Sequence, residues 1–498
     1  MRTPKATGAS PADLYGPLLA AVQESGILAD GKTFVDAVPR RPIADIMADF
    51  ARLGGERGEL LQFVTANFDL PAAATPPSSG AATMPLRAHI RAMWSTLARG
   101  PRSGEINSSA LPVGHRHVVP GGRFREIYYW DSFFTMLGLL RDDELALAGG
   151  MVDAMTDLIE EHGHVPNGTR TYYLGRSQPP LFHMMVALLD DRRPQVAARR
   201  VAAMKREHGW WMDGVERLRP GMQVNHVAML ADGSVLNRYW DPRGTPRDES
   251  WREDVATALG SGRPVADVYR DLRAGAESGW DFSSRWFGGA DLSSICTTQI
   301  AAVDLNAFLY GLETALAATG DDDAPAYADR ARRRREAMHR HLWYEAGGYF
   351  ADHGLSEGTL RPALTAAAFA PLLAGSATQA QADATAAVAE AALIAPGGLR
   401  TTLVESGEQW DCPNGWAPLQ WIAVAGLRRY GHGDLADVIG RRWIDTVDTA
   451  YNRTGLLFEK YDIEAGSVGG GGEYAAQVGF GWTNGVTADL IDSMNGAG

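Results

Sequence analysis

Cysteines and long apolar runs are scarce in this sequence. Its two cysteines, Cys296 and Cys412, are too few for a disulfide framework. No apolar run reaches the roughly 18–20 residues that a membrane-spanning helix needs. The most apolar stretch, residues 300–320, carries Asp304 and Glu313 and is typical of an amphipathic core helix. We therefore expect neither a membrane association nor a disulfide scaffold.

An excess of positive charge is also absent. Asp and Glu number 60 against 47 Lys and Arg, and the net charge is −13, which argues against a nucleic-acid partner. The N-terminus has two early positive charges, but its apolar part is short and interrupted by Pro17, and no clean cleavage site follows. We expect a mature start and a cytoplasmic protein; the alternative is a periplasmic protein whose leader peptide has been removed.

Several catalytic signatures are missing. The sequence has no G-x-S-x-G elbow and no dinucleotide fingerprint, and no Gly-Lys-Ser/Thr follows the glycine run 469–472. The His-Arg-His runs at 115–117 and 339–341 lack the His-Glu-x-x-His spacing of a zinc site. We expect no metal and no cofactor.

Helical periodicity dominates what is present. Apolar stripes recur throughout the chain, for example at 133–140, 300–318 and 416–430, whereas strand-like alternation is brief, as at 348–351. This pattern predicts an all-α fold. The intervening Gly- and Pro-rich loops are unusually long, which is typical of a helical scaffold whose loops build one site.

One segment reads as a linker. The stretch "PAAATPPSSGAAT" (71–83) is rich in proline and alanine. We predict that it separates an N-terminal helical arm, residues 1–80, from a catalytic domain, residues 81–498, on which the arm packs.

Aromatic rings and carboxylates stand side by side in the loops. Trp-Asp pairs occur at 130–131, 240–241, 280–281 and 410–411, where chance would give roughly one. Their irregular spacing argues against a β-propeller. Sugars favour such surroundings, because their C–H faces stack on rings while their hydroxyls bond to polar side chains. Arg123, Asn167, Gln178 and Trp416 are further candidates in these loops.

Hydrolysis of a glycosidic bond needs two carboxyl groups, one that acts as an acid and one that acts as a base or nucleophile. Asp281 suits the acid, because Trp280 and Phe282 should raise its pKa; the alternative is a helix-capping aspartate. Glu459 and Glu473 are both candidates for the second carboxylate. Glu459 follows an apolar run that would hold it rigidly, whereas Glu473 follows four glycines and suits a closing loop.

Five segments resemble the trehalases of glycoside hydrolase family 37. "PGGRFREIYYWDSFF" and "QWDCPNGWAP" are similar to the two diagnostic motifs, and "ESGWDFSSRW", "FEKYD" and "GGGGEY" with "GFGWTNG" follow the family's order. The resemblance implies an (α/α)6 barrel and hydrolysis of α,α-trehalose to two glucose molecules, with inversion and no cofactor. We expect a monomer. The alternative is an inverting glucosidase of the same barrel type that acts on another α-glucosyl disaccharide.

The resemblance also implies roles for individual residues. Asp281 is similar to the family's general acid and Glu459 to its base. The positions similar to its sugar-contacting and lid residues are Arg123, Trp130, Asp131, Asn167, Arg176, Ser177, Gln178, Arg247, Asp248, Glu249, Gly279 and Glu473. Asp248 stands where the family has proline, Ala475 replaces a second proline, and Val478 replaces an acidic residue.

Overall fold

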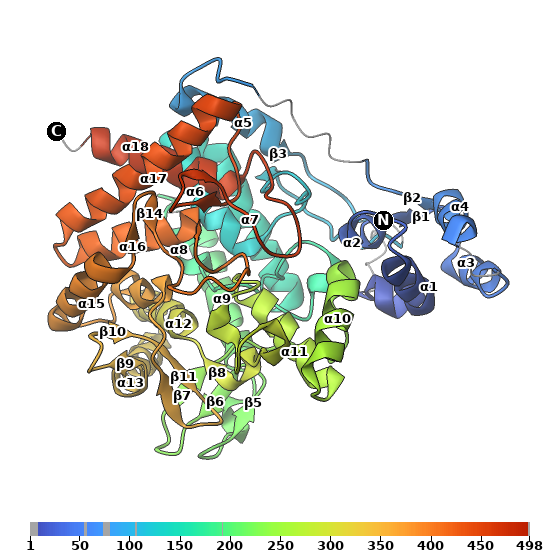
Figure 1. Ribbon diagram of the computed structural model, residues 1–498. Helices are drawn as coiled ribbons and strands as arrows, with labels where there is room; N and C mark the ends of the chain where they lie inside the picture. The colour runs from blue at the N-terminus through green and yellow to red at the C-terminus, as the bar shows by residue number, and fades with distance from the viewer. Residues whose placement is uncertain (1–7, 54–56, 73–79, 105–106, 192, 497–498) are drawn as a thin grey trace.

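The computed structural model describes residues 8–53, 57–72, 80–104, 107–191 and 193–496. Helices dominate it, as the sequence predicts (Figure 1). Most of the predicted linker, residues 73–79, lies outside the described residues, so the predicted boundary between arm and catalytic domain stays a prediction. No helix in the described part of the chain is long and apolar enough to cross a membrane.

The main body consists of two concentric layers of helices. The inner helices are α6 (Tyr129–Arg141), α8 (Phe182–Ala187), α12 (Val303–Ala317), α14 (Ala370–Ala374), α16 (Ala417–Arg429) and α18 (Gly481–Asn495). The outer helices are α5 (Leu86–Leu97), α7 (Leu145–His162), α9 (Pro194–Trp211), α13 (Ala324–His341), α15 (Gln379–Ala392) and α17 (Gly433–Thr454). The chain alternates between the layers, which confirms the (α/α)6 barrel that the family resemblance implies.

The ring closes where α18 packs against α6. Glycine permits this close approach: a Cβ on Gly138 would lie 2.7 Å from the Cα of Gly485, and a Cβ on Gly485 would lie 2.1 Å from the carbonyl oxygen of Phe134. The inner helices are buried over most of their surface, whereas the outer helices bury one stripe and expose the other face. The first and last inner helices of the barrel are therefore held together by backbone-to-backbone packing.

The N-terminal helices form a separate small cluster beside the barrel (Figure 1). They are α1 (Pro11–Ser25), α2 (Gly31–Val35), α3 (Ile43–Phe50) and α4 (Arg57–Asn67). Their apolar side chains surround Phe34 and Phe68, whose rings lie 5.1 Å apart, and also contact Tyr172 and Tyr173 of a barrel loop. The helix α2 therefore lies against the end of the barrel where the loops gather.

Two more helices, α10 (Trp251–Ser261) and α11 (Val265–Glu277), flank this end. The strands are short antiparallel pairs within the loops: β1 (Val38–Pro39) with β2 (Phe68–Asp69), β3 (Ala98–Arg99) with β4 (His117–Val118), β9 (Trp343–Tyr344) with β10 (Tyr349–Phe350), and β13 (Ile394–Ala395) with β14 (Gly398–Leu399). Three-stranded sheets join β5 (Gln223–Val224), β6 (Val227–Met229) and β7 (Val235–Asn237); β8 (Ile300–Ala301), β11 (Asp352–Gly354) and β12 (Thr359–Arg361); and β15 (Asn414–Gly415), β16 (Tyr461–Asp462) and β17 (Ser467–Val468).

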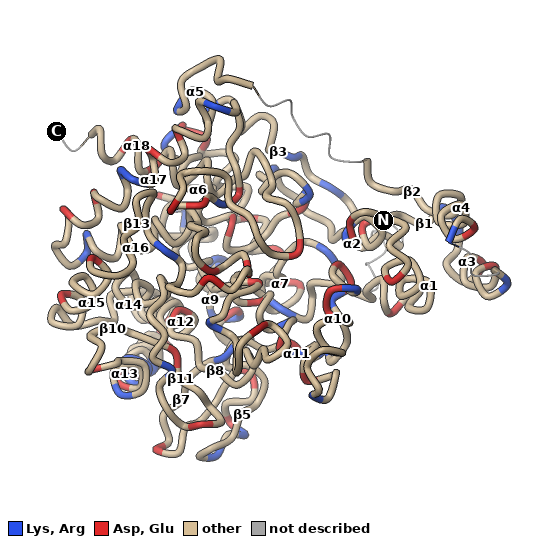
Figure 2. The backbone as a smooth tube through the Cα atoms, in the orientation of Figure 1, with Lys and Arg blue, Asp and Glu red and all other residues tan. Residues whose placement is uncertain are grey.

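Charged positions of both signs are interspersed along most elements (Figure 2). The basic stretch on α13 illustrates how they are compensated. Arg332 and Arg333 are exposed and pair with Asp329 of the same helix, while Arg334 is buried and pairs with Glu313 of α12 at 2.8 Å. The basic stretch therefore belongs to the solvated surface of α13 and, through Arg334, to its packing against α12.

Candidate active site

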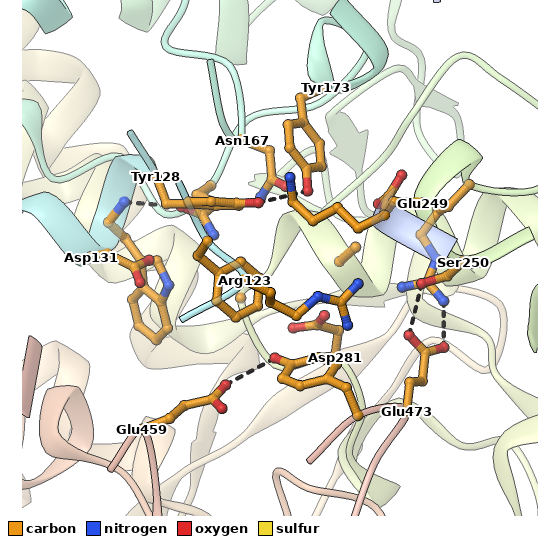
Figure 3. Close-up of a pocket in the computed structure, with 18 of the residues that line it drawn as sticks. Arg123, Tyr128, Asp131, Asn167, Tyr173, Glu249, Ser250, Asp281, Glu459 and Glu473 are labelled. Atoms are coloured by element: carbon orange, nitrogen blue, oxygen red, sulfur yellow. Dashed lines mark hydrogen bonds and ion pairs between the residues drawn. The ribbon is translucent and has the colours of Figure 1, made fainter. Parts of the chain in front are cut away.

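Loops from both halves of the barrel, together with α2, enclose one pocket. The residues predicted from the sequence that line it are Arg123, Trp130, Asp131, Asn167, Arg176, Gln178, Arg247, Glu249, Gly279, Asp281, Glu459 and Glu473. Figure 3 shows the carboxylates of Asp281, Glu459 and Glu473 in this one pocket. Residues that are nearly 180 positions apart along the chain therefore meet at a single site.

Asp281 lies in the loop that follows α11. It does not cap a helix: the next helical turn, Ser284–Trp286, is capped by Ser283, whose side chain accepts from the backbone N–H of Arg285. Both neighbours, Trp280 and Phe282, are buried. Burial raises the pKa of Asp281 to about 7, with smaller upward contributions from Glu473 and Glu459 and an opposing one from Arg247. A substantial fraction of this carboxyl is thus protonated at neutral pH.

Glu459 has a different environment. Its Oε1 accepts a hydrogen bond of 2.9 Å from the Tyr474 hydroxyl, and its Oε2 accepts one of 3.1 Å from the backbone N–H of Gln477. Its own backbone is fixed as well, because its carbonyl accepts from the Trp482 indole at 2.9 Å. Both donors to the carboxylate lie in residues 469–480, which we call the lid segment. The lid segment therefore orients Glu459.

Glu473, also in the lid segment, reaches across the pocket. It accepts from Arg247 Nη2 at 2.6 Å and from the Ser250 hydroxyl at 3.0 Å. Arg247 is itself held by Asp254 of α10 at 2.6 Å. This network closes the lid segment against the opposite wall of the pocket.

The other arginines of the pocket are also paired with carboxylates. Arg176 contacts Glu249 at 2.5 Å, and Arg123 contacts Asp30, which precedes α2, at 2.8 Å. Burial alone would raise the pKa of Glu249, but Arg176 and Arg247 together bring it below its usual value. These pairs fix the guanidinium planes before any substrate enters the pocket.

Asp131 and Gly279 are both neighbours of Trp130, Asp131 in the sequence and Gly279 in space. Burial, with contributions from Glu459 and Asp281, raises the pKa of Asp131 well above its usual value. Gly279 has a φ of +76°, and a Cβ there would lie 2.8 Å from the Trp130 ring. Only glycine fits this position without displacing the indole.

Two predicted residues do not line the pocket. Asp248 points toward the N-terminal helices, where its Oδ2 accepts from the backbone N–H of Ala12 at 2.8 Å. Ser177 is buried in the wall; its hydroxyl donates to the Val165 carbonyl at 2.6 Å, and its backbone N–H donates to Glu277. The reason is local geometry, because consecutive residues of a turn or an extended segment point in different directions.

Two aromatic candidates named from the sequence, Trp410 and Trp416, also line the pocket. The lining residues that were not predicted are Lys32, Phe124, Tyr128, Tyr173, Ser250, Ala276, Tyr474, Phe480 and Trp482. The tryptophans and Tyr474 lie inside the conspicuous aromatic motifs, so the sequence carried a signal for them. The sequence carried no such signal for Lys32, which belongs to α2 and is placed by its ion pairs with Asp36 and Glu126.

The (α/α)6 barrel and the buried pair of carboxylates define the chain as a glycoside hydrolase. The trehalase family model matches residues 28–495. The periplasmic trehalase of Xanthomonas campestris pv. campestris (strain 8004) is 48% identical over 98% of this chain and 87% of its own length. The periplasmic trehalase of Salmonella newport is 48% identical over 96% of this chain and 86% of its own. The chain belongs to the trehalase family.

Solved structures agree with this assignment. The neutral trehalase of Saccharomyces cerevisiae superposes with a TM-score of 0.63 at 26% identity, covering 83% of this chain and 80% of that chain. A mannosylglycerate hydrolase of Thermus thermophilus has a TM-score of 0.55 at 19% identity over 82% of this chain and 100% of that chain, which shows the shared fold. The expectation of a cytoplasmic protein is wrong, because the relatives that are 48% identical are periplasmic trehalases.

Proposed function

We propose that this chain hydrolyses α,α-trehalose to two glucose molecules with inversion, Asp281 acting as general acid and Glu459 as general base. The observation that carries this proposal is the contrast between two carboxylates of one pocket. Asp281 has a pKa of about 7 because it is buried, so it can hold a proton. Glu459 accepts hydrogen bonds from two donors, which hold its carboxylate in one orientation, as a base needs.

The reaction is a single displacement. Asp281 donates its proton to the oxygen that bridges the two glucose units, while Glu459 removes a proton from a water that attacks the anomeric carbon. The bond from that carbon to the bridging oxygen breaks as the bond to the water oxygen forms. Inversion requires room for this water, so we expect the two carboxyl groups to lie about 6.5–9.5 Å apart.

The remaining pocket residues bind the two sugar rings. Indole rings offer flat faces for sugar C–H groups, and paired arginines offer fixed donors to hydroxyls. The residues proposed for this role are Arg123, Trp130, Asp131, Asn167, Arg176, Gln178, Arg247, Glu249, Gly279 and Glu473. Because the arginines are already held by carboxylates, little conformational entropy is lost when the substrate binds.

Two further proposals concern the location and the oligomeric state of the protein. We propose a periplasmic location, as in the relatives named above. We also propose that the chain acts as a monomer. Size-exclusion chromatography with light scattering tests the second proposal.

Two substitutions test the roles of the carboxylates. Asp281→Asn and Glu459→Gln should each lower kcat for glucose release by about 100-fold or more, because each removes one proton-transfer group. Trehalose binding, measured by calorimetry, should persist in both. Near-normal turnover in either variant refutes that assignment. Turnover on maltose, kojibiose and nigerose beside trehalose tests the alternative of another α-glucosyl disaccharide.

A further inference from the structure

Lys460 is a buried cation beside the proposed base. Its side chain is fully buried, and no carboxylate of the described residues lies within ion-pair distance of its ammonium group. The ammonium instead donates to Gln409 Oε1 at 2.6 Å and lies 5.3 Å and 5.2 Å from the ring centres of Trp416 and Tyr474. Burying a charge without an ion pair is costly, so its presence calls for a function.

Gln409 connects this lysine to the proposed acid. Its side-chain N–H donates to the backbone carbonyl of Asp281. The backbone carbonyl of Gln409 accepts from the Trp416 indole at 3.1 Å and from the Asn414 amide at 3.0 Å, so Gln409 is itself held firmly. A continuous path therefore runs from the backbone of Asp281 through Gln409 to the residue that follows Glu459.

The lid segment closes over this path. A Cβ on Gly469 would lie 2.9 Å from Lys460 Cγ, and a Cβ on Gly472 would lie 2.9 Å from Gln409 Cβ. Gly472 also has a φ of +78°. The glycines of the lid segment thus allow its backbone to pass directly over Gln409 and Lys460.

We propose that Lys460 is a positioning residue for the reaction: through Gln409 it fixes the spacing between Asp281 and Glu459, and it places a positive charge beside both carboxylates. The inference rests on the proposed roles of these two carboxylates. Burial lowers the pKa of Lys460, while Glu459 and Asp281 act in the opposite direction. The other ionisable groups around Glu459 are Asp131 of α6 and Tyr474 of the lid segment.

Two substitutions separate the two parts of this role. Lys460→Met removes both the charge and the link, and we expect kcat to fall by about 10- to 100-fold because the acid and base lose their spacing. The basic limb of the kcat/KM profile should move up, because Lys460 interacts with Asp281 and loss of this positive charge raises the pKa of the acid. Gln409→Met removes the link alone, so kcat should fall while the basic limb stays in place.

The double variant tests whether the two residues act as a unit. Because they form one link, the Lys460→Met/Gln409→Met variant should lose about as much kcat as the worse single variant, not the product of both losses. Lys205→Met is the matched control, since Lys205 is a surface lysine of α9 paired with Asp321 and Asp323. It removes one positive charge and should leave kcat and the pH profile unchanged.

Three results would overturn the inference: a kcat of Lys460→Met within about twofold of the parent enzyme, a basic limb that does not move in that variant, or multiplicative losses in the double variant. Thermal denaturation checks folding. If Lys460→Met does not fold, an unchanged kcat in Gln409→Met is by itself sufficient to overturn the inference. Glu459→Gln is assayed in parallel: turnover in that variant refutes the proposed function, whereas an inactive Glu459→Gln beside a normal Lys460→Met refutes only the role of Lys460.

Discussion

The hydroxyl of Tyr474 provides a sharp test of the proposed base. This hydroxyl donates to Glu459 Oε1 at 2.9 Å from the lid segment. The Tyr474 ring makes separate contacts, with the Phe124 ring at 5.5 Å and with the Arg123 guanidinium at 4.7 Å. Tyr474→Phe keeps these ring contacts and removes one hydrogen bond. Its effect therefore measures the hydroxyl and leaves lid closure intact.

The expected loss follows from the charge of the acceptor. A hydrogen bond to a charged group contributes about 1.5–3 kcal/mol, and every 1.4 kcal/mol changes a rate by about tenfold. We expect kcat/KM of Tyr474→Phe to fall by about 10- to 100-fold. The Gln477 N–H still holds the other oxygen of Glu459, so activity should not be abolished.

Glucose release from trehalose, measured over a range of substrate concentrations, gives kcat/KM. The matched control is Tyr430→Phe, because Tyr430 donates its hydroxyl to the Ala377 carbonyl at 2.9 Å and lies outside the pocket. The control should lose a little thermal stability and no activity. A kcat/KM of Tyr474→Phe within about threefold of the parent enzyme refutes the role of this hydroxyl.

Three further substitutions test other parts of the structure. Glu473→Gln removes a negative charge that helps burial raise the pKa of Asp281 to about 7, so the acid deprotonates at lower pH and the basic limb of the kcat/KM profile should move down. Asp30→Asn removes the partner of Arg123, and steady-state kinetics should show KM raised by about fivefold, equivalent to about 1 kcal/mol. Arg285→Met leaves two buried carboxylates without their shared cation, which should cost about 3–5 kcal/mol and lower the midpoint of thermal unfolding.

The environment of the acid was predictable, because it is set by neighbours in the sequence. Trp280 and Phe282 flank Asp281, and both are buried in the structure. The orientation of Asp248 was not predictable, although it stands between Arg247 and Glu249, which both face the pocket. The three residues form a single turn, and only the packing of α1 decides which side chain points away from the site.

The arrangement of distant elements was less predictable. Helical periodicity predicted the all-α class, since each inner helix carries its own apolar pattern, and the family resemblance implied the barrel. Neither predicted that α2 delivers Lys32 to the pocket, because that placement depends on a buried contact with Glu126 at 2.6 Å. The hydrogen bonds that Tyr474 and Gln477 donate to Glu459 were not predictable either, because they depend on how the glycine-rich lid segment folds back over the base.

The tryptophans of the pocket wall give this enzyme an intrinsic optical signal. Trp410 and Trp416 are stacked with ring centres 3.8 Å apart and planes at 3°, and Trp280 lies 5.6 Å from Trp410. Stacked indoles couple electronically, so their near-ultraviolet circular dichroism and fluorescence depend on their mutual geometry. Because the Trp410 and Trp416 rings line the pocket, occupancy of the site can be followed in unlabelled protein, in real time and without a coupled assay.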